Sequence, residues 1–120
     1  MKDNPTLKQW FREYNRRYFG NRLPDTLVCW VELKGSYGRQ FRRRTVRYRV
    51  TNGKWKMFKS DRPMIFISAV LLRKDWVSVA RSTLLHEMVH LSLPLRINHG
   101  PRFQAGMLRI AKAGAFKGLW

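Results

Sequence analysis

Residues 83–91 read TLLHEMVHL, an apolar pattern of helical spacing that carries two histidines four residues apart. Because four residues advance an α-helix by about one turn, both imidazoles project from the same face. Apolar residues continue at helical spacing back toward Trp76, and Pro94 ends the pattern. We therefore predict a long helix from Trp76 to about Leu91, with Asp75 as its N-cap.

The two histidines belong to the sequence pattern H-E-x-x-H, in which both rings can bind one metal ion. His86 and His90 supply two ligands, and we expect His99 as the third because it is the one remaining histidine of the chain. A catalytic zinc ion keeps three protein ligands and one open position, so we expect one Zn²⁺ ion. Glu87 follows the first ligand directly, and its carboxylate can take a proton from a water that the ion activates.

Two other interpretations of this pattern stay open. Three fixed positions are few enough for chance matches on metal-free helices, although all histidines of the chain gather here, which argues against chance. A closed structural zinc site would need a fourth ligand, and Cys29 is the only thiol. The metzincin pattern is excluded, because it requires a glycine and a histidine where this chain has Leu93 and Arg96.

Helix signals also occur near both ends of the chain. Asn4 and Pro5 are typical of a helix start, apolar residues follow at helical spacing, and Gly20 is typical of a helix end. A last helix is expected to begin at Gly100-Pro101. The third candidate ligand, His99, therefore lies immediately before the start of a helix, a position that fixes a side chain well.

The region between the first two helices predicts strands. β-Branched and aromatic residues gather at Thr26–Leu33, Thr45–Tyr48 and Met64–Ser68, and Asn52-Gly53 predicts a hairpin turn. The order of elements predicts an α+β fold. We expect a compact domain with an N-terminal helix, a small antiparallel sheet, the helix that bears the histidine pair and a following C-terminal helix.

The composition excludes several classes of protein. The 120 residues are 44% hydrophobic, which suits one domain with a core and excludes a wholly disordered chain. The single cysteine excludes a disulfide framework and a zinc ribbon, and we expect Cys29, Trp10 and Trp76 in the core. The run Met64–Leu72 is too short to span a membrane, and the N-terminus lacks a signal-peptide pattern. We expect an intracellular monomer, in the cytoplasm or nucleoid, or in the nucleus of a eukaryote.

The charge of the chain favours a polyanionic partner. The net charge is +18, and between Glu32 and Asp61 the chain has ten basic residues and no acid, interleaved with aromatic residues. Arginine can bind phosphate through two hydrogen bonds, and aromatic rings can stack on bases, so we expect DNA, with single-stranded DNA as one candidate. The candidate contacts are Arg39, Arg42, Arg43, Arg44, Arg47, Arg49, Lys54, Trp55, Lys56 and Lys59. The alternative is a solvated hairpin in which Tyr48 and Trp55 pack in the core instead.

Several motifs together resemble the SprT-like metalloprotease domain of the Spartan/SprT family. The resemblance rests on FREYNRRYFGNRLP at residues 11–24, the strand at residues 28–30, the glycine turn at 35–38, IFIS at 65–68, LLHEMVH at 84–90 and HGPRF at 99–103. It therefore spans most of the chain, although the basic segment between Gly38 and Pro63 has no counterpart that we can align.

The resemblance implies a single zincin-like metalloprotease domain over residues 1–120, without an appended zinc ribbon, that cleaves proteins bound or crosslinked to DNA. It implies zinc ligands at His86, His90 and His99 and a general base at Glu87. Two alternatives stay open. One is a nucleic-acid-binding module with a non-catalytic zinc site. The other is a protease that its basic surface directs to acidic proteins or anionic surfaces.

Overall fold

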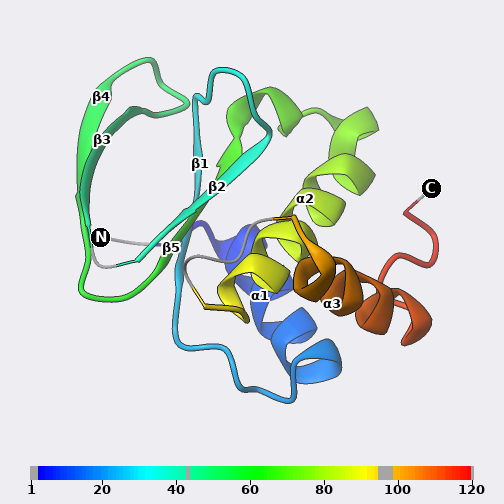
Figure 1. Ribbon diagram of the computed structural model, residues 1–120. Helices are drawn as coiled ribbons and strands as arrows, with labels where there is room; N and C mark the ends of the chain where they lie inside the picture. The colour runs from blue at the N-terminus through cyan, green and yellow to red at the C-terminus, as the bar shows by residue number, and fades with distance from the viewer. Residues whose placement is uncertain (1–2, 43, 95–98, 120) are drawn as a thin grey trace.

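The helix that carries the histidine pair, α2 (Val77–Leu91), lies in the middle of the computed structural model, which describes residues 3–42, 44–94 and 99–119 (Figure 1). The other elements are, in chain order, α1 (Pro5–Tyr18), β1 (Leu27–Val31), β2 (Gly38–Phe41), β3 (Thr45–Arg49), β4 (Trp55–Lys59), β5 (Met64–Ser68), the 3₁₀ turns η1 (Ala69–Leu71) and η2 (Lys74–Trp76), and α3 (Pro101–Lys112). Apolar residues occur around most of the circumference of α2, which contacts β2, β5, α1 and α3.

The α+β fold class is confirmed, and so are the signals at the start and end of α1. The side chain of Asn4 accepts a hydrogen bond from the backbone N–H of Leu7 at 3.1 Å, as an N-cap does. Gly20 follows the helix with φ +59°, in the left-handed region that glycine tolerates. Asp75 does not cap α2 as predicted: the N-cap is Trp76, and Asp75 lies one residue earlier in η2.

Three strands form the main sheet in the order β1-β5-β2. β2 pairs with β5 antiparallel, as expected for this sheet, whereas β1 pairs with β5 in parallel. The parallel pair is possible because a long connection, which contains β2, β3 and β4, returns the chain to the same end of the sheet. All five residues of the central strand β5 are buried, in agreement with its unbroken apolar sequence.

The main sheet separates two hydrophobic clusters, because successive side chains of a strand point to opposite faces. Ile65 and Ile67 of β5 belong to the larger cluster, which they form with residues of α1, α2 and α3. Met64 and Phe66 belong to the smaller cluster, together with residues of β3 and β4. Figure 1 shows this division, with the helices on one side of the sheet and the hairpin of β3 and β4 on the other.

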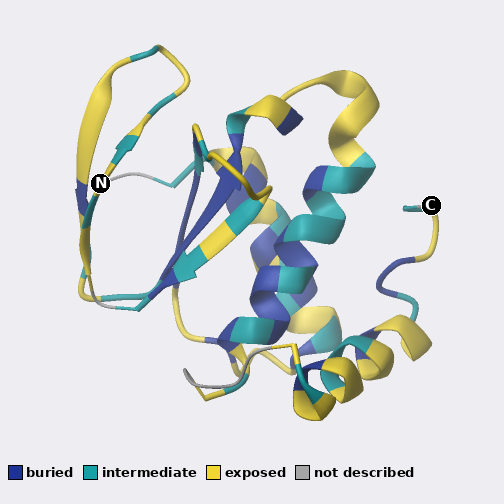
Figure 2. Cartoon of the chain, turned by 45° about the horizontal axis from the view of Figure 1, so that its top comes forward, coloured by how far each residue is buried: buried dark blue, intermediate teal, exposed yellow. Residues whose placement is uncertain are grey.

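The hairpin turns where the sequence predicts, since Asn52-Gly53 lies between β3 and β4 and Gly53 has φ +82°. Its inner face packs on the sheet through aromatic rings: the centroids of Tyr48 and Phe58 lie 5.1 and 4.9 Å from that of Phe66. The other face is exposed (Figure 2). Tyr48 is therefore a packing residue, whereas Trp55 is 60% exposed and does not belong to the core.

Three further sequence predictions concern burial. Cys29 is buried, and Trp10 is partly buried against the larger cluster. The prediction of Trp76 as a core residue is wrong: it is 37% exposed and contacts Tyr37 edge to face, because no residue of η2 reaches the core. Among the helices of the described ranges, none is long and apolar enough to cross a membrane.

Candidate metal centre

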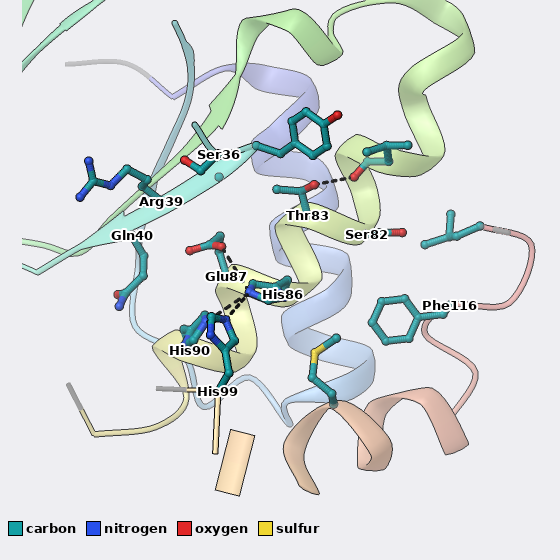
Figure 3. A pocket seen from close by; sticks show the side chains of 15 residues that line it. Ser36, Arg39, Gln40, Ser82, Thr83, His86, Glu87, His90, His99 and Phe116 are labelled. Carbon is teal, nitrogen blue, oxygen red and sulfur yellow. Dashed lines mark hydrogen bonds and ion pairs between the residues drawn. The ribbon is translucent and has the colours of Figure 1, made fainter. Parts of the chain in front are cut away.

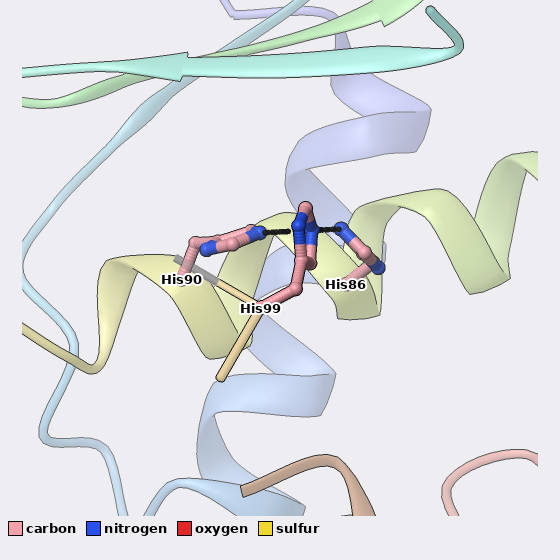
Figure 4. Close-up of side chains that lie close together, drawn as sticks. All are labelled: His86, His90 and His99. Atoms are coloured by element: carbon pink, nitrogen blue, oxygen red, sulfur yellow. Dashed lines mark hydrogen bonds between the residues drawn. The ribbon is translucent and has the colours of Figure 1, made fainter. Parts of the chain in front are cut away.

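Two elements bring three histidines together. His86 and His90 project from one face of α2, one turn apart, and His99 approaches from the residues just before α3 (Figure 4). The Nε2 atoms are 3.2 Å apart for the pair on α2, and 3.1 Å separates each of them from Nε2 of His99. The predicted convergence of the three rings on one point is therefore present in the structure.

The contacts among these nitrogens favour a cation between them. A ring nitrogen of neutral histidine either donates or accepts, so at least one of the three pairs must bring two donors or two acceptors together. A cation removes this conflict because it accepts all three lone pairs. In a tetrahedral zinc site with bonds of about 2.0–2.1 Å, ligand atoms lie about 3.3–3.4 Å apart. The distances of 3.1–3.2 Å fit such a site closely.

The protonation of the rings suits a metal ligand set. Burial, together with the neighbouring His99, lowers the pKa of His86. Burial and the charges of His86 and His99 lower the pKa of His90 to about 4. Both rings are therefore neutral at pH 7, and a neutral ring offers the lone pair that a metal ion requires.

A phenylalanine supports all three ligands. Phe103, on the first turn of α3, is 2% exposed. Its ring centroid lies 4.3 Å from that of His90 and 4.8 Å from those of His86 and His99. This ring restricts the three imidazoles to their orientations, a role that the sequence indicates only through the motif HGPRF at residues 99–103.

Glu87 is buried beside the histidines, with 7% of its surface exposed. Its Oε2 atom lies 3.9 Å from Nε2 of His86, so the carboxylate is close to the cluster without being one of the three converging groups. Burial raises the pKa of Glu87 to about 7, and the charge of Arg39 acts in the opposite direction. A cation held by the histidines acts in the same direction as Arg39 and favours the ionised carboxylate.

Gly38 of β2 gives Glu87 its place against the sheet. A Cβ atom at this position would lie 2.6 Å from Cγ2 of Thr83 and 3.1 Å from Cγ of Glu87. Only glycine therefore allows β2 to approach α2 this closely. Gly38 is a residue of the candidate site that the sequence did not reveal; the one signal was its place in the glycine turn at residues 35–38.

A cavity of about 730 Å³ opens over the metal centre (Figure 3). Residues 36–40 line one side, and Glu87 and the three histidines lie between that side and Phe116. Its volume is within the range of about 300–1,000 Å³ that is usual for ligand sites. The arrangement of a ligand set, a buried carboxylate and an open cavity can support hydrolysis of a substrate that enters the cavity.

The predicted DNA contacts fall on separate surfaces. Four of them, Arg47, Arg49, Trp55 and Lys59, are exposed on one face of the hairpin. Thr45 and Met57 are exposed on the same face, and we call these six side chains the outer hairpin face. The guanidinium carbon of Arg47 lies 5.3 Å from the centroid of the Trp55 ring, and Arg49 is 3.5 Å from the carboxylate of Glu32. This face combines charge with an exposed aromatic ring.

The other candidate contacts lie elsewhere. Arg42 turns to the end of α2, where its Nη2 donates to the carbonyl oxygens of His90, Leu91 and Leu93 at 3.1, 3.2 and 2.7 Å. Arg39 lines the cavity. Arg44, Lys54 and Lys56 are exposed outside the outer hairpin face, and Arg43 lies outside the described residues. Arg42 is thus a residue that holds α2 in place, and we leave it out of any DNA surface.

Comparison with known proteins agrees with this geometry. The model of the SprT-like family matches residues 7–118, nearly the whole chain, including β2, α2 and all three histidines. The search of curated proteins gave no match.

Proposed function

The chain belongs to the SprT-like family, and from this premise we propose that it is a zinc-dependent endopeptidase with His86, His90 and His99 as ligands. The family and the histidine cluster give a metalloprotease-type domain with a potential metal site. The single observation that carries the proposal is the convergence of three Nε2 atoms within 3.2 Å of one another, next to a buried carboxylate.

Each residue of the site has a distinct task in the proposed reaction. The zinc ion, when bound, polarises the peptide carbonyl and lowers the pKa of water. Glu87 takes the proton of the attacking water and passes it to the nitrogen of the leaving amine, which breaks the peptide bond. Its burial keeps bulk water from competing for that proton.

The sheet offers a place for the backbone of the substrate. β2 is the last strand of the main sheet, and among the described residues it pairs with β5 alone. Because β2 lines the cavity, an extended peptide can add to its free edge through backbone hydrogen bonds. Such pairing is independent of side chains, so it suits an enzyme that acts on many sequences.

The test is the substitution Glu87→Gln, which keeps the shape of the side chain but removes the base. We expect the variant to bind zinc like the wild type, by metal analysis after gel filtration, and to lose cleavage by at least about 100-fold. As a matched control, Gln9→Glu on the exposed face of α1 should leave cleavage unchanged. Equal cleavage by Glu87→Gln and the wild type would contradict the assignment of the base.

We further propose that the outer hairpin face binds DNA and brings the enzyme to proteins bound or crosslinked to DNA. Arg47, Arg49 and Lys59 surround Trp55 and Met57, which are 60% and 56% exposed. Exposed aromatic rings amid cations are typical of surfaces that bind single strands. DNA would then raise the local concentration of enzyme near its substrates. An intracellular monomer suits this role.

Salt dependence tests the DNA contacts. The double variant Arg47→Ala/Lys59→Ala should lower the slope of log affinity against log salt by about 1.8 on duplex DNA, since each phosphate contact contributes about 0.9. The control Lys112→Ala/Lys117→Ala removes the same charge at and beyond the end of α3 and should keep the slope. An equal decrease of the slope in both double variants would show that DNA affinity depends on net charge and would contradict specific contacts at Arg47 and Lys59.

The cleavage assay should include DNA, because it separates the two alternative functions. Stimulation of cleavage by single-stranded DNA supports a protease that acts at DNA. Cleavage of acidic proteins without such stimulation favours a protease that its charge directs to acidic surfaces. DNA binding without cleavage of any protein favours a nucleic-acid-binding module with a non-catalytic zinc site.

A further inference from the structure

The cavity over the metal centre has two ends of opposite chemistry. Arg39 and Gln40 of β2 line one end. Figure 3 shows Phe116 at the other end, with Thr83 and His86 between them. Apart from Ser82, whose hydroxyl donates to the carbonyl oxygen of Ser78, the side chains at that second end are apolar, and we call these apolar side chains the apolar end of the cavity. They are Val79, Met107, Phe116 and Leu119.

These four side chains come from three parts of the fold. Val79 belongs to the first turn of α2, Met107 to the middle of α3, and Phe116 and Leu119 to the segment that follows α3. Phe116 is buried, whereas the other three are only partly buried where they pack against the larger cluster. Their remaining apolar surface faces the cavity, and covering it with an apolar group would be favourable.

The positions of the charged residues around the cavity also favour an apolar occupant. Apart from the histidines, its charged lining residues are Arg39 and Glu87, and neither belongs to the apolar end. An ionised side chain placed there would lose its hydration without gaining a partner among the described lining residues. The apolar end therefore favours an uncharged, apolar occupant.

We propose that the apolar end is a specificity pocket that binds one large apolar side chain, such as leucine, methionine or phenylalanine, next to the scissile bond of the substrate. This inference rests on the proposed peptidase function. It follows from continuity: the apolar end shares one cavity with His86, so a peptide held at the metal centre places a neighbouring side chain there. The enzyme then prefers exposed or unfolded apolar segments of its protein substrates.

The size of the peptide side chains sets how strongly the pocket should prefer one peptide over another. A hydrophobic pocket distinguishes side chains that differ by one methylene by about 10-fold or more. Leucine and alanine differ by three carbon atoms, so we expect at least about 10-fold between them, and more between leucine and aspartate or lysine.

Binding to the zinc-loaded variant Glu87→Gln tests this proposal separately from catalysis. Peptides of one sequence, with leucine, phenylalanine, alanine, aspartate or lysine on either side of the intended scissile bond, are titrated by calorimetry. The peptides with leucine or phenylalanine on one side should bind at least about 10-fold more tightly than the alanine peptide. Equal affinity of all peptides would overturn the proposal.

Two variants locate the preference in the pocket. In the Glu87→Gln background, Met107→Glu should abolish the preference for apolar peptides and favour lysine, whereas Leu108→Glu, on the exposed face of α3, should keep it. If Met107→Glu fails to fold, Leu119→Ala serves as the second variant because it changes no charge. It should weaken binding of the leucine peptide about 10-fold. Retention of the full preference in both pocket variants would also overturn the proposal.

The outcomes for this proposal and for the proposed function are distinct. If the variant Glu87→Gln discriminates among the peptides but the wild type cleaves none of them, the result supports the apolar pocket and contradicts the peptidase function. If the wild type cleaves all peptides at equal rates, the result supports the peptidase function and contradicts the apolar pocket.

Discussion

Replacing Gly38 with alanine should separate the position of Glu87 from the binding of metal. Carbon atoms in contact lie about 3.5–4.0 Å apart, whereas the new methyl carbon would lie 2.6 Å from Cγ2 of Thr83 and 3.1 Å from Cγ of Glu87. β2 and α2 must therefore move apart by about 1 Å. Overpacking of this kind lowers the free energy of unfolding by about 1–3 kcal/mol.

The displacement should also reduce catalysis. Moving a reacting group by about 1 Å can lower the rate by about 100-fold, so we expect kcat for peptide cleavage to fall by that order. The three atoms closest to the added carbon belong to Thr83 and Glu87 and not to a histidine, so the zinc content should stay the same. Stability is measured by denaturant unfolding, and kcat with a fluorogenic peptide.

A second glycine provides the matched control. A Cβ atom on Gly106 of α3 would lie 2.9 Å from Cγ1 of Val89, so Gly106→Ala overpacks the contact between α2 and α3 instead. We expect a similar loss of stability with a much smaller loss of kcat. In addition, Thr83→Ser in the Gly38→Ala background removes the closest carbon and should restore part of the stability. An equal loss of kcat in both glycine variants would refute the reasoning.

Three further results are expected. Arg42→Ala should lower the free energy of unfolding by about 1.5–3 kcal/mol in denaturant titrations, because carbonyl groups at the end of α2 lose a charged donor; an unchanged midpoint would show that the contacts contribute nothing. Burial raises the pKa of Cys29 to about 11 from 9.0, so the proton stays bound in the folded state while the unfolded state releases it, and this part of the stability should be lost as the pH rises from about 9 to 11; Cys29→Ala should flatten that part of the pH profile. Removal of metal by a chelator should lower the melting temperature, and zinc at 100 times its dissociation constant should restore about 2.7 kcal/mol; the variant His99→Ala should respond less to both.

Local patterns in the sequence were sufficient to predict the cluster of three histidines. His86 and His90 are placed by the regular geometry of one helix, and His99 by the start of the next helix, so a spacing pattern is informative for all three. The same holds for the Asn4 cap and the strand Met64–Ser68, which depend on neighbours in the chain.

Contacts between distant segments could not be predicted in this way. The parallel pairing of β1 with β5 depends on the path of the whole segment between them. The contact of Gly38 with Glu87 and the role of Arg42 at the end of α2 join residues about 50 positions apart. Arg39, Arg42 and Arg47 look equivalent in the sequence, yet Arg39 lines the cavity, Arg42 donates to carbonyl groups at the end of α2, and Arg47 is exposed on the hairpin.

The two faces of the main sheet give the molecule two regions that can change independently. In β5, Ile65 and Ile67 pack with residues of α2, the helix that carries the histidine pair, while Met64 and Phe66 pack with residues of the hairpin. Substitutions on the outer hairpin face touch neither set, so evolution or an engineer can alter this surface and leave the histidine cluster intact. By the same reasoning β5, which serves both regions at once, should tolerate the fewest substitutions of any strand.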